Sequence, residues 1–110
     1  MDDNRRRCPR FPFYAAAKIT EIQSGVPLTT RTSELSRYGC YMDTMNPFPI
    51  ATPVKMEFLY DDEAINLDGT VIYSQPNMGM GVVFAEVTET AESILRRWLD
   101  RLREINPAIA

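Results

Sequence analysis

Two runs of alternating apolar residues in the middle of the chain restrict its fold more than any other feature. Apolar residues or glycine occupy every second position from Val54 to Tyr60, and again from Ile65 to Tyr73. A period of two is typical of a β-strand that buries one face. The acidic turn at residues 61–63 separates the runs and is short enough to join antiparallel neighbours. The pattern therefore predicts an antiparallel hairpin at the centre of a mainly β protein.

Several other segments have the composition of β-strands. β-Branched and aromatic residues are frequent in them, and glycine, proline or asparagine separates most of them from the next. Pro47, Pro49 and Pro53 exclude a helix from the longest connection. Gly79 and Gly81 indicate a kink or a close backbone approach at the corner of a barrel. Together with the central hairpin, these segments give six predicted strands, at residues 14–23, 28–35, 40–42, 54–60, 65–73 and 78–87.

The last part of the chain changes to a helical period. Its apolar residues recur at spacings of three and four, as on one face of an amphipathic helix. Thr88 is suited to cap this helix and Pro107 to stop it, which predicts a helix over about residues 88–105. We expect the apolar face to cover one mouth or face of the strand body, with Trp98 as its plug; a dimer contact is the alternative. The face consists of Ala91, Ile94, Leu95, Trp98, Leu99, Leu102 and Ile105.

These elements predict a small six-stranded antiparallel β-barrel with a C-terminal α-helix. The 110 residues fit a single domain, and no internal repeat or low-complexity linker divides them. We expect a flexible, arginine-rich N-terminal arm over residues 1–10 and one domain over residues 11–105.

Basic side chains are concentrated at the N-terminus. Four of the 12 basic residues lie within the first ten positions, namely Arg5, Arg6, Arg7 and Arg10. A guanidinium group forms paired hydrogen bonds to phosphate oxygens or to a guanine edge, and it stacks on purine rings. A solvated tail is the other interpretation, but Pro9 restricts the chain and the apolar segment 11–14 follows directly, which ties the arginines to the core. The segment therefore indicates an anion clamp suited to a nucleotide.

The composition argues against several classes of function. A net charge of −3 argues against general binding to nucleic acids or membrane surfaces. The absence of histidine excludes histidine-based catalysis, and the two cysteines fit neither a zinc pattern nor a disulfide framework. No apolar run approaches the roughly 20 residues of a membrane span, and no apolar signal segment is present. We therefore expect a cytoplasmic binding protein without a cofactor, not an enzyme, in which the acidic turn at 61–63 is a solvated hairpin tip.

Three short motifs occur in a fixed order along the chain. R-x-x-x-R is matched from Arg6 to Arg10, [D/N]-x-S-x-x-G is approached from Glu34 to Gly39, and G-x-G-x-x-F is matched from Gly79 to Phe84, just before the helix. Either of the first two motifs alone is weak evidence for a protein family, but the order and spacing of all three together are specific to one. In this combination the chain resembles the PilZ domain family, bacterial receptors for the second messenger cyclic di-GMP, over about residues 5–105.

The resemblance implies that an N-terminal arm folds over one face of the barrel and traps cyclic di-GMP. Arg6 and Arg10 would bind phosphate oxygens and guanine edges, while Arg5 or Arg7 would add charge or stack on a base. The arm would become ordered around the ligand, and the change of shape would pass the signal to a protein partner.

The second motif departs from the family pattern because Glu34 stands where Asp or Asn is expected. The resemblance implies that Ser36 offers a hydroxyl to the ligand and that Gly39 lets the backbone approach it. Glu34 can still accept hydrogen bonds from a guanine, but its longer side chain shifts the acceptor and loses more rotamer entropy. We expect binding to be weaker by roughly 1–2 kcal/mol. The alternative is a degenerate PilZ domain that does not bind nucleotide and acts as a protein-interaction adaptor.

The two cysteines adjoin the motifs, Cys8 within the first and Cys40 directly after the second. Either they approach each other when the arm closes, or they are unrelated thiols; neighbouring arginines favour the thiolate of Cys8. Ligand stoichiometry and oligomeric state stay open at this stage. Candidate partner surfaces are the proline-rich connection at residues 45–53 and the polar side of the helix, formed by Arg96, Arg97, Asp100, Arg103 and Glu104.

Overall fold

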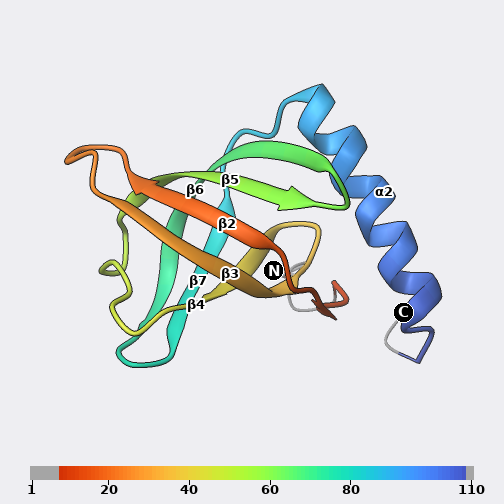
Figure 1. Ribbon diagram of the computed structural model, residues 1–110, viewed down its shortest axis with the longest axis horizontal. Coiled ribbons are helices and arrows are strands. Elements are labelled where there is room, and N and C mark those ends of the chain that lie inside the picture. Colours follow the sequence, from red (N-terminus) through yellow and green to blue (C-terminus); the bar gives the residue numbers. More distant parts are fainter. Residues whose placement is uncertain (1–7, 109–110) are drawn as a thin grey trace, which may run out of the picture.

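The computed structural model describes residues 8–108 (Figure 1). Arg5, Arg6, Arg7 and most of the expected arm therefore lie outside the described residues. Within this part the chain forms seven strands and one helix. The elements are β1 (Phe11–Pro12), β2 (Ala16–Glu21), β3 (Pro27–Leu35), β4 (Gly39–Asp43), β5 (Pro53–Tyr60), β6 (Glu63–Gln75), β7 (Gly79–Phe84) and α2 (Glu89–Ile105).

Strands β2 to β7 form a closed antiparallel barrel. The strand order is β3-β2-β5-β6-β7-β4, and the sheet closes because β4 also pairs with β3. All six strands expected from the sequence are present, so the predicted six-stranded barrel with a C-terminal helix is confirmed. The seventh strand, β1, was not expected from the pattern and continues along β3 beyond the end of the β2 pairing.

The barrel interior holds the apolar face of the central hairpin. Val54, Met56 and Phe58 on β5 are buried, as are Ile65 and Leu67 on the neighbouring β6. Alternation therefore places the core side chains as the sequence predicts. Full burial of such a side chain contributes roughly 1.5–3 kcal/mol, which makes this hairpin a main source of the barrel's stability.

The alternation fails at the end of β6. The register between β6 and β7 shifts between Val71 and Tyr73, as in a β-bulge. A shift of one residue moves the following side chains to the other face of a sheet. Val71 is fully buried, but Tyr73 is 49% exposed on the outside of the barrel. The pattern that grouped Tyr73 with the inward residues is therefore wrong at this position.

Helix α2 begins and ends as its sequence predicts. The Thr88 hydroxyl accepts a hydrogen bond from the backbone N–H of Ala91, and the Asn106 N–H bonds to the carbonyl of Leu102 at the other end. The helix contacts β6 and β1 and lies across one end of the barrel (Figure 1). Within residues 8–108, no helix has both the length and the apolar character needed to cross a membrane.

The apolar face of α2 is buried against the chain's own barrel. Trp98 is almost completely buried, and its ring lies 5.5 Å from that of Phe13 and 5.3 Å from that of Tyr60. It is the plug that the sequence predicts, and most of the face is thus not free for a dimer contact. Ile105 is an exception, because it is 64% exposed at the end of the helix.

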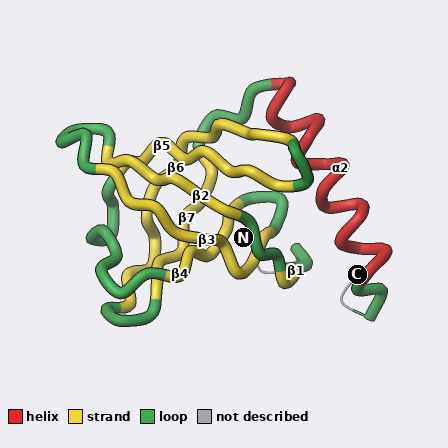
Figure 2. The backbone as a smooth tube through the Cα atoms, in the orientation of Figure 1, coloured by secondary structure: helices red, strands yellow, loops and turns green. Residues whose placement is uncertain are grey.

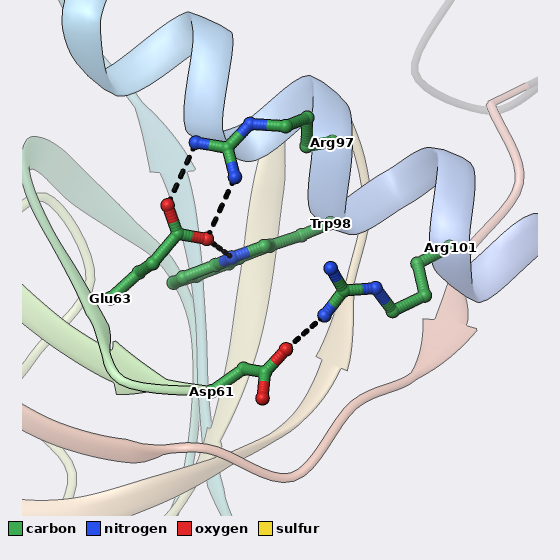
Figure 3. A network of polar contacts seen from close by, with 5 residues as sticks. All are labelled: Asp61, Glu63, Arg97, Trp98 and Arg101. Atoms are coloured by element: carbon green, nitrogen blue, oxygen red, sulfur yellow. Dashed lines mark hydrogen bonds and ion pairs between the residues drawn. The ribbon is translucent and has the colours of Figure 1, made fainter.

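The acidic turn between β5 and β6 is attached to the helix (Figure 3). Asp61 and Asp62 both have a positive φ, as a two-residue type I′ hairpin turn requires. Glu63 accepts two hydrogen bonds from Arg97, at 2.9 and 2.7 Å, and Arg101 forms an ion pair with Asp61. The turn is exposed to solvent as expected, and its carboxylates in addition form ion pairs with α2.

We predict that the contact between Glu63 and Arg97 makes stability depend on pH. The hydrogen bond from Arg97 lowers the pKa of Glu63 below its usual value. A lowered pKa stabilises the fold above the unfolded-state pKa of about 4.3, and this contribution is lost as the pH falls through the folded-state pKa. Glu63→Gln should therefore lower the unfolding temperature at pH 7, and the difference from the unsubstituted chain should shrink in acid.

Thermal unfolding followed by circular dichroism at a series of pH values from about 7 to about 2 measures this difference, since the series passes through the whole range in which carboxylates titrate. Glu57→Gln on the exposed face of β5 is the control and should change little at any pH of the series. A difference for Glu63→Gln that persists unchanged in acid would show that the ion pair does not stabilise the helix.

Candidate functional site

The short strand β1 holds Arg10 beside the second motif. Phe11 pairs with Leu35 and Pro12 with Glu34, so the end of the first motif lies next to the start of the second. Burial of Phe11 and Phe13, which are 1% and 2% exposed, fixes this arrangement. The prediction that the arginines are tied to the core is thus confirmed for Arg10, whose own side chain is exposed.

A cleft of about 410 Å³ opens on the outside of the barrel at this point. Every predicted site residue in the described part of the chain lines it, and these are Arg10, Glu34, Ser36 and Gly39. The other two predicted site residues, Arg5 and Arg6, lie outside the described residues. The cleft therefore brings together the ends of two motifs that are more than 20 positions apart in the sequence.

A row of paired residues forms the floor of the cleft. Glu34 on β3 pairs with Tyr41 on β4, Tyr41 pairs with Gly81 on β7, and Gly81 pairs with Tyr73 on β6. Directly paired residues project from the same face of a sheet. The cleft thus presents a carboxylate and two tyrosines on one rigid surface, with a glycine between the tyrosines.

The glycines of β7 provide space for these tyrosines. A Cβ atom on Gly81 would lie 2.3 Å from Cδ2 of Tyr73, and one on Gly79 would lie 2.6 Å from Cε2 of Tyr41. Both rings thus pack directly on glycine backbone, and the Tyr41 hydroxyl donates a hydrogen bond to Gln75. The close approach that the sequence predicts for this strand is confirmed.

The turn from Ser36 to Gly39 is closed by its own hydrogen bonds. The Ser36 N–H donates to the Gly39 carbonyl at 2.9 Å, its hydroxyl donates to the same carbonyl at 3.3 Å, and the Tyr38 N–H donates to that hydroxyl. A Cβ on Gly39 would lie 2.4 Å from the carbonyl oxygen of Val82, so only glycine fits against β7. Both motif residues therefore shape the turn, and the Ser36 proton is already used within it.

Comparisons with known proteins identify the family. A family model of the PilZ domain matches residues 4–101. The chain belongs to the PilZ domain family. A comparison with curated proteins returned no match.

Solved structures of PilZ domains share this fold. The PilZ domain of CeSA from a cellulose-synthesizing bacterium is 20% identical with a TM-score of 0.70, and the alignment covers 86% of this chain and 97% of that one. The PilZ domain of Escherichia coli YcgR, solved with c-di-GMP, is 18% identical with a TM-score of 0.71, covering 93% and 94% of the two chains.

A second structure of Escherichia coli YcgR in complex with c-di-GMP is 19% identical and has a TM-score of 0.75. The alignment covers 94% of this chain but only 48% of that one, so this chain spans about half the length of that relative. At these identities the likeness is one of fold.

The electrostatics of the PilZ cleft keep Tyr41 neutral. Burial raises the pKa of Tyr41 above its usual value, and the nearby charges of Asp43 and Glu34 raise it further. Tyr41 therefore remains a hydroxyl at neutral pH. The cleft also contains one described cation, Arg10, and one carboxylate, Glu34, so it offers both donors and acceptors to a polar ligand.

Sequence reasoning missed the aromatic side chains of the cleft. Tyr38, Tyr41 and Tyr73 line it, but none belongs to a fixed position of the motifs. The G-x-G pattern is the one available signal, because glycines in a strand mark places where another group packs on the backbone. Among the described residues, no group of three or more Cys, Asp or Glu could hold a metal ion.

The two cysteines have different surroundings. Both are free thiols; Cys40 lines the cleft but is buried, while Cys8 is partly exposed. Burial raises the pKa of Cys40 to about 12. The expected approach of the two thiols depends on the arm and stays a prediction.

We predict that a maleimide at about pH 7.5 labels Cys8 and leaves Cys40 unmodified in the native protein, because only a thiolate reacts and a buried thiol with a raised pKa forms almost none. Mass spectrometry after denaturation should then find one free thiol. Cys8→Ser is the control and should abolish native labelling. Rapid native labelling of Cys40 would contradict its burial.

Proposed function

We propose that this PilZ domain is a receptor for cyclic di-GMP, which binds in the cleft between the N-terminal segment and the turn at residues 36–39. The observation that carries the proposal is the meeting of Arg10 and Glu34 beside two tyrosines on one side of the barrel. Phosphates need cationic donors, guanine edges need an acceptor, and bases need flat apolar surfaces. The cleft offers a group for each.

Each group has a specific role in this proposal. Arg10 binds a phosphate or the O6/N7 edge of a guanine, and Glu34 accepts hydrogen bonds from N1–H and N2–H of a base. Tyr73 provides a ring for base stacking at the open side of the cleft. Arg5 and Arg6 add further positive charge to the same ligand. The solved YcgR PilZ domain with c-di-GMP supports the ligand by its likeness in fold.

The turn at residues 36–39 is the element that relays binding in this proposal. Tyr38 lines the cleft and also a second groove of about 590 Å³ between the barrel and α2. Its carbonyl accepts a hydrogen bond of 2.7 Å from the N–H of Phe84, at the end of β7. A ligand that shifts this turn therefore changes the groove beside the helix, where a protein effector would detect it. The role is that of a receptor, with no catalytic step.

Isothermal titration of cyclic di-GMP into the chain tests the proposal. We expect saturable binding, and no binding of GTP. Arg10→Ala should weaken affinity by roughly ten-fold to a hundred-fold, because a charge-assisted hydrogen bond contributes about 1.5–3 kcal/mol. Tyr73→Ala should weaken it by at least about five-fold through lost stacking.

Arg31→Ala is a matched control for these variants. Arg31 is an exposed arginine of β3 that pairs with Asp43 outside the cleft, so its removal should leave affinity unchanged. An intact chain that shows no heat with high-micromolar cyclic di-GMP would overturn the receptor function and leave the adaptor alternative. Equal loss in all three variants would place the ligand elsewhere.

We predict that Glu34→Asp binds cyclic di-GMP more tightly, by about ten-fold. The shorter side chain restores the acceptor position of the family motif and loses less rotamer entropy. Titration of both chains under the same conditions measures the ratio. Equal or weaker binding by Glu34→Asp would mean that Glu34 is already adapted to its place beside Tyr41.

A further inference from the structure

Gln75 is a polar residue of the cleft to which the proposed function gives no role. It is the last residue of β6 and lines the cleft together with Tyr73. Strands β4, β7 and β6 lie side by side in this part of the barrel (Figure 2). Residues two apart on a strand project from the same face and lie roughly 7 Å apart. The amide of Gln75 is therefore within reach of the edge of a base that stacks on Tyr73.

The Tyr41 hydroxyl sets the direction of this amide. Tyr41 stays protonated at neutral pH, because burial and nearby carboxylates raise its pKa, so it is available as a donor. It donates a hydrogen bond to Oε1 of Gln75. The Tyr41 ring packs on Gly79, which pairs with Gln75 across the two strands. The amide carbonyl is therefore held toward Tyr41, which leaves the NH2 group for a ligand.

This hydrogen bond changes which base the amide prefers. A free glutamine amide pairs with adenine, because its carbonyl accepts from the N6 amino group and its NH2 group donates to N7. At Gln75 a lone pair of the carbonyl is already occupied, so the amide acts chiefly as a donor. Guanine presents two acceptors, O6 and N7, on the edge where adenine presents its N6 donor. A donor at this place therefore favours guanine over adenine.

We propose that Gln75, held by Tyr41, is a specificity residue of the cleft. Its NH2 group donates to O6 or N7 of the guanine that stacks on Tyr73 and discriminates against adenine. The inference rests on the proposed function and adds the recognition of a second base. Glu34 on β3 and Gln75 on β6 have β4 and β7 between them along the floor of the cleft. Cyclic di-GMP carries two guanines, so each of the two residues contacts a base of its own.

Isothermal titration with cyclic di-GMP and cyclic di-AMP tests the inference, because the two ligands differ only in their bases. We expect the unsubstituted chain to prefer cyclic di-GMP. Gln75→Glu keeps an acceptor for Tyr41 but offers no donor to a base, so the ratio of the two affinities should fall at least about ten-fold. The added negative charge acts on the phosphates of both ligands alike and cancels in the ratio.

Tyr41→Phe tests the orienting role of the hydroxyl. It frees the Gln75 carbonyl to accept from the N6 amino group of adenine, so the ratio should fall about three-fold or more although Gln75 is unchanged. A tyrosine that only packs on the floor would affect both ligands equally. Gln23→Glu is the matched control. Gln23 is the other glutamine of the chain, is exposed and does not line the cleft, so its replacement should leave the ratio unchanged.

The side-chain amide of Gln75 gives a second readout. The chain has two glutamines, and the NH2 signals of Gln75 in an NMR spectrum are those that disappear in Gln75→Glu. They should shift on saturation with cyclic di-GMP, while those of Gln23 stay in place. This readout needs no binding of cyclic di-AMP.

Three results, each with cyclic di-GMP still bound, would overturn this inference and leave the receptor function intact. These are Gln75 amide signals that do not shift, a ratio that Gln75→Glu leaves unchanged, and equal losses of both ligands in Tyr41→Phe. An intact chain that binds no cyclic di-GMP would overturn both proposals.

Discussion

Burial of two phenylalanines next to the N-terminal arginines determines the rest of this structure. Phe11 sets β1 against β3, and Phe13 packs 4.6 Å from Tyr60 and 5.5 Å from Trp98, measured between ring centroids. Each buried phenylalanine contributes roughly 1.5–3 kcal/mol. The same two side chains therefore pack against the end of the barrel, contact the helix and position Arg10 at the edge of the cleft. Their burial stabilises both the fold and the site.

The cleft gains its shape from strands rather than from loops. Glu34, Tyr41 and Tyr73 project from neighbouring strands of a closed barrel, and the glycines of β7 let the tyrosine rings lie against the sheet. Groups on such a frame change position little when a ligand arrives. The turn at residues 36–39 lies between the cleft and the groove beside α2, because Tyr38 lines both. In the proposed function, the strands hold the ligand and a shift of this turn passes binding on to the groove.

The sequence predicts those parts of the molecule that depend on local periodicity. Six strands and the helix follow from the spacing of apolar residues, and the helix start follows from Thr88. The sequence pattern does not reveal strand β1, because this strand has only two residues and one of them, Pro12, has no backbone N–H to donate to a sheet. The outward position of Tyr73 depends on a bulge, for which a single sequence contains no marker.

Contacts between residues far apart in the sequence could not be predicted either. The ion pairs of Asp61 and Glu63 join residues 34 to 40 positions apart, and exposed charges carry no periodic signal. The motifs allowed some cleft residues to be predicted, namely Arg10 and those from Glu34 to Gly39, because the family resemblance specifies these positions. Its aromatic floor required the register of four strands, which only the folded chain gives.

The most direct test of this account is a titration of isotopically labelled chain with cyclic di-GMP, followed by amide chemical shifts in NMR. The account predicts the largest changes at Gly39, Tyr41, Tyr73 and Gly81, with smaller ones spreading through Tyr38 to Phe84 beside α2. Changes confined to the loops at residues 22–26, 44–52 and 76–78 or to the outer face of β5, or none at saturating ligand, would contradict it.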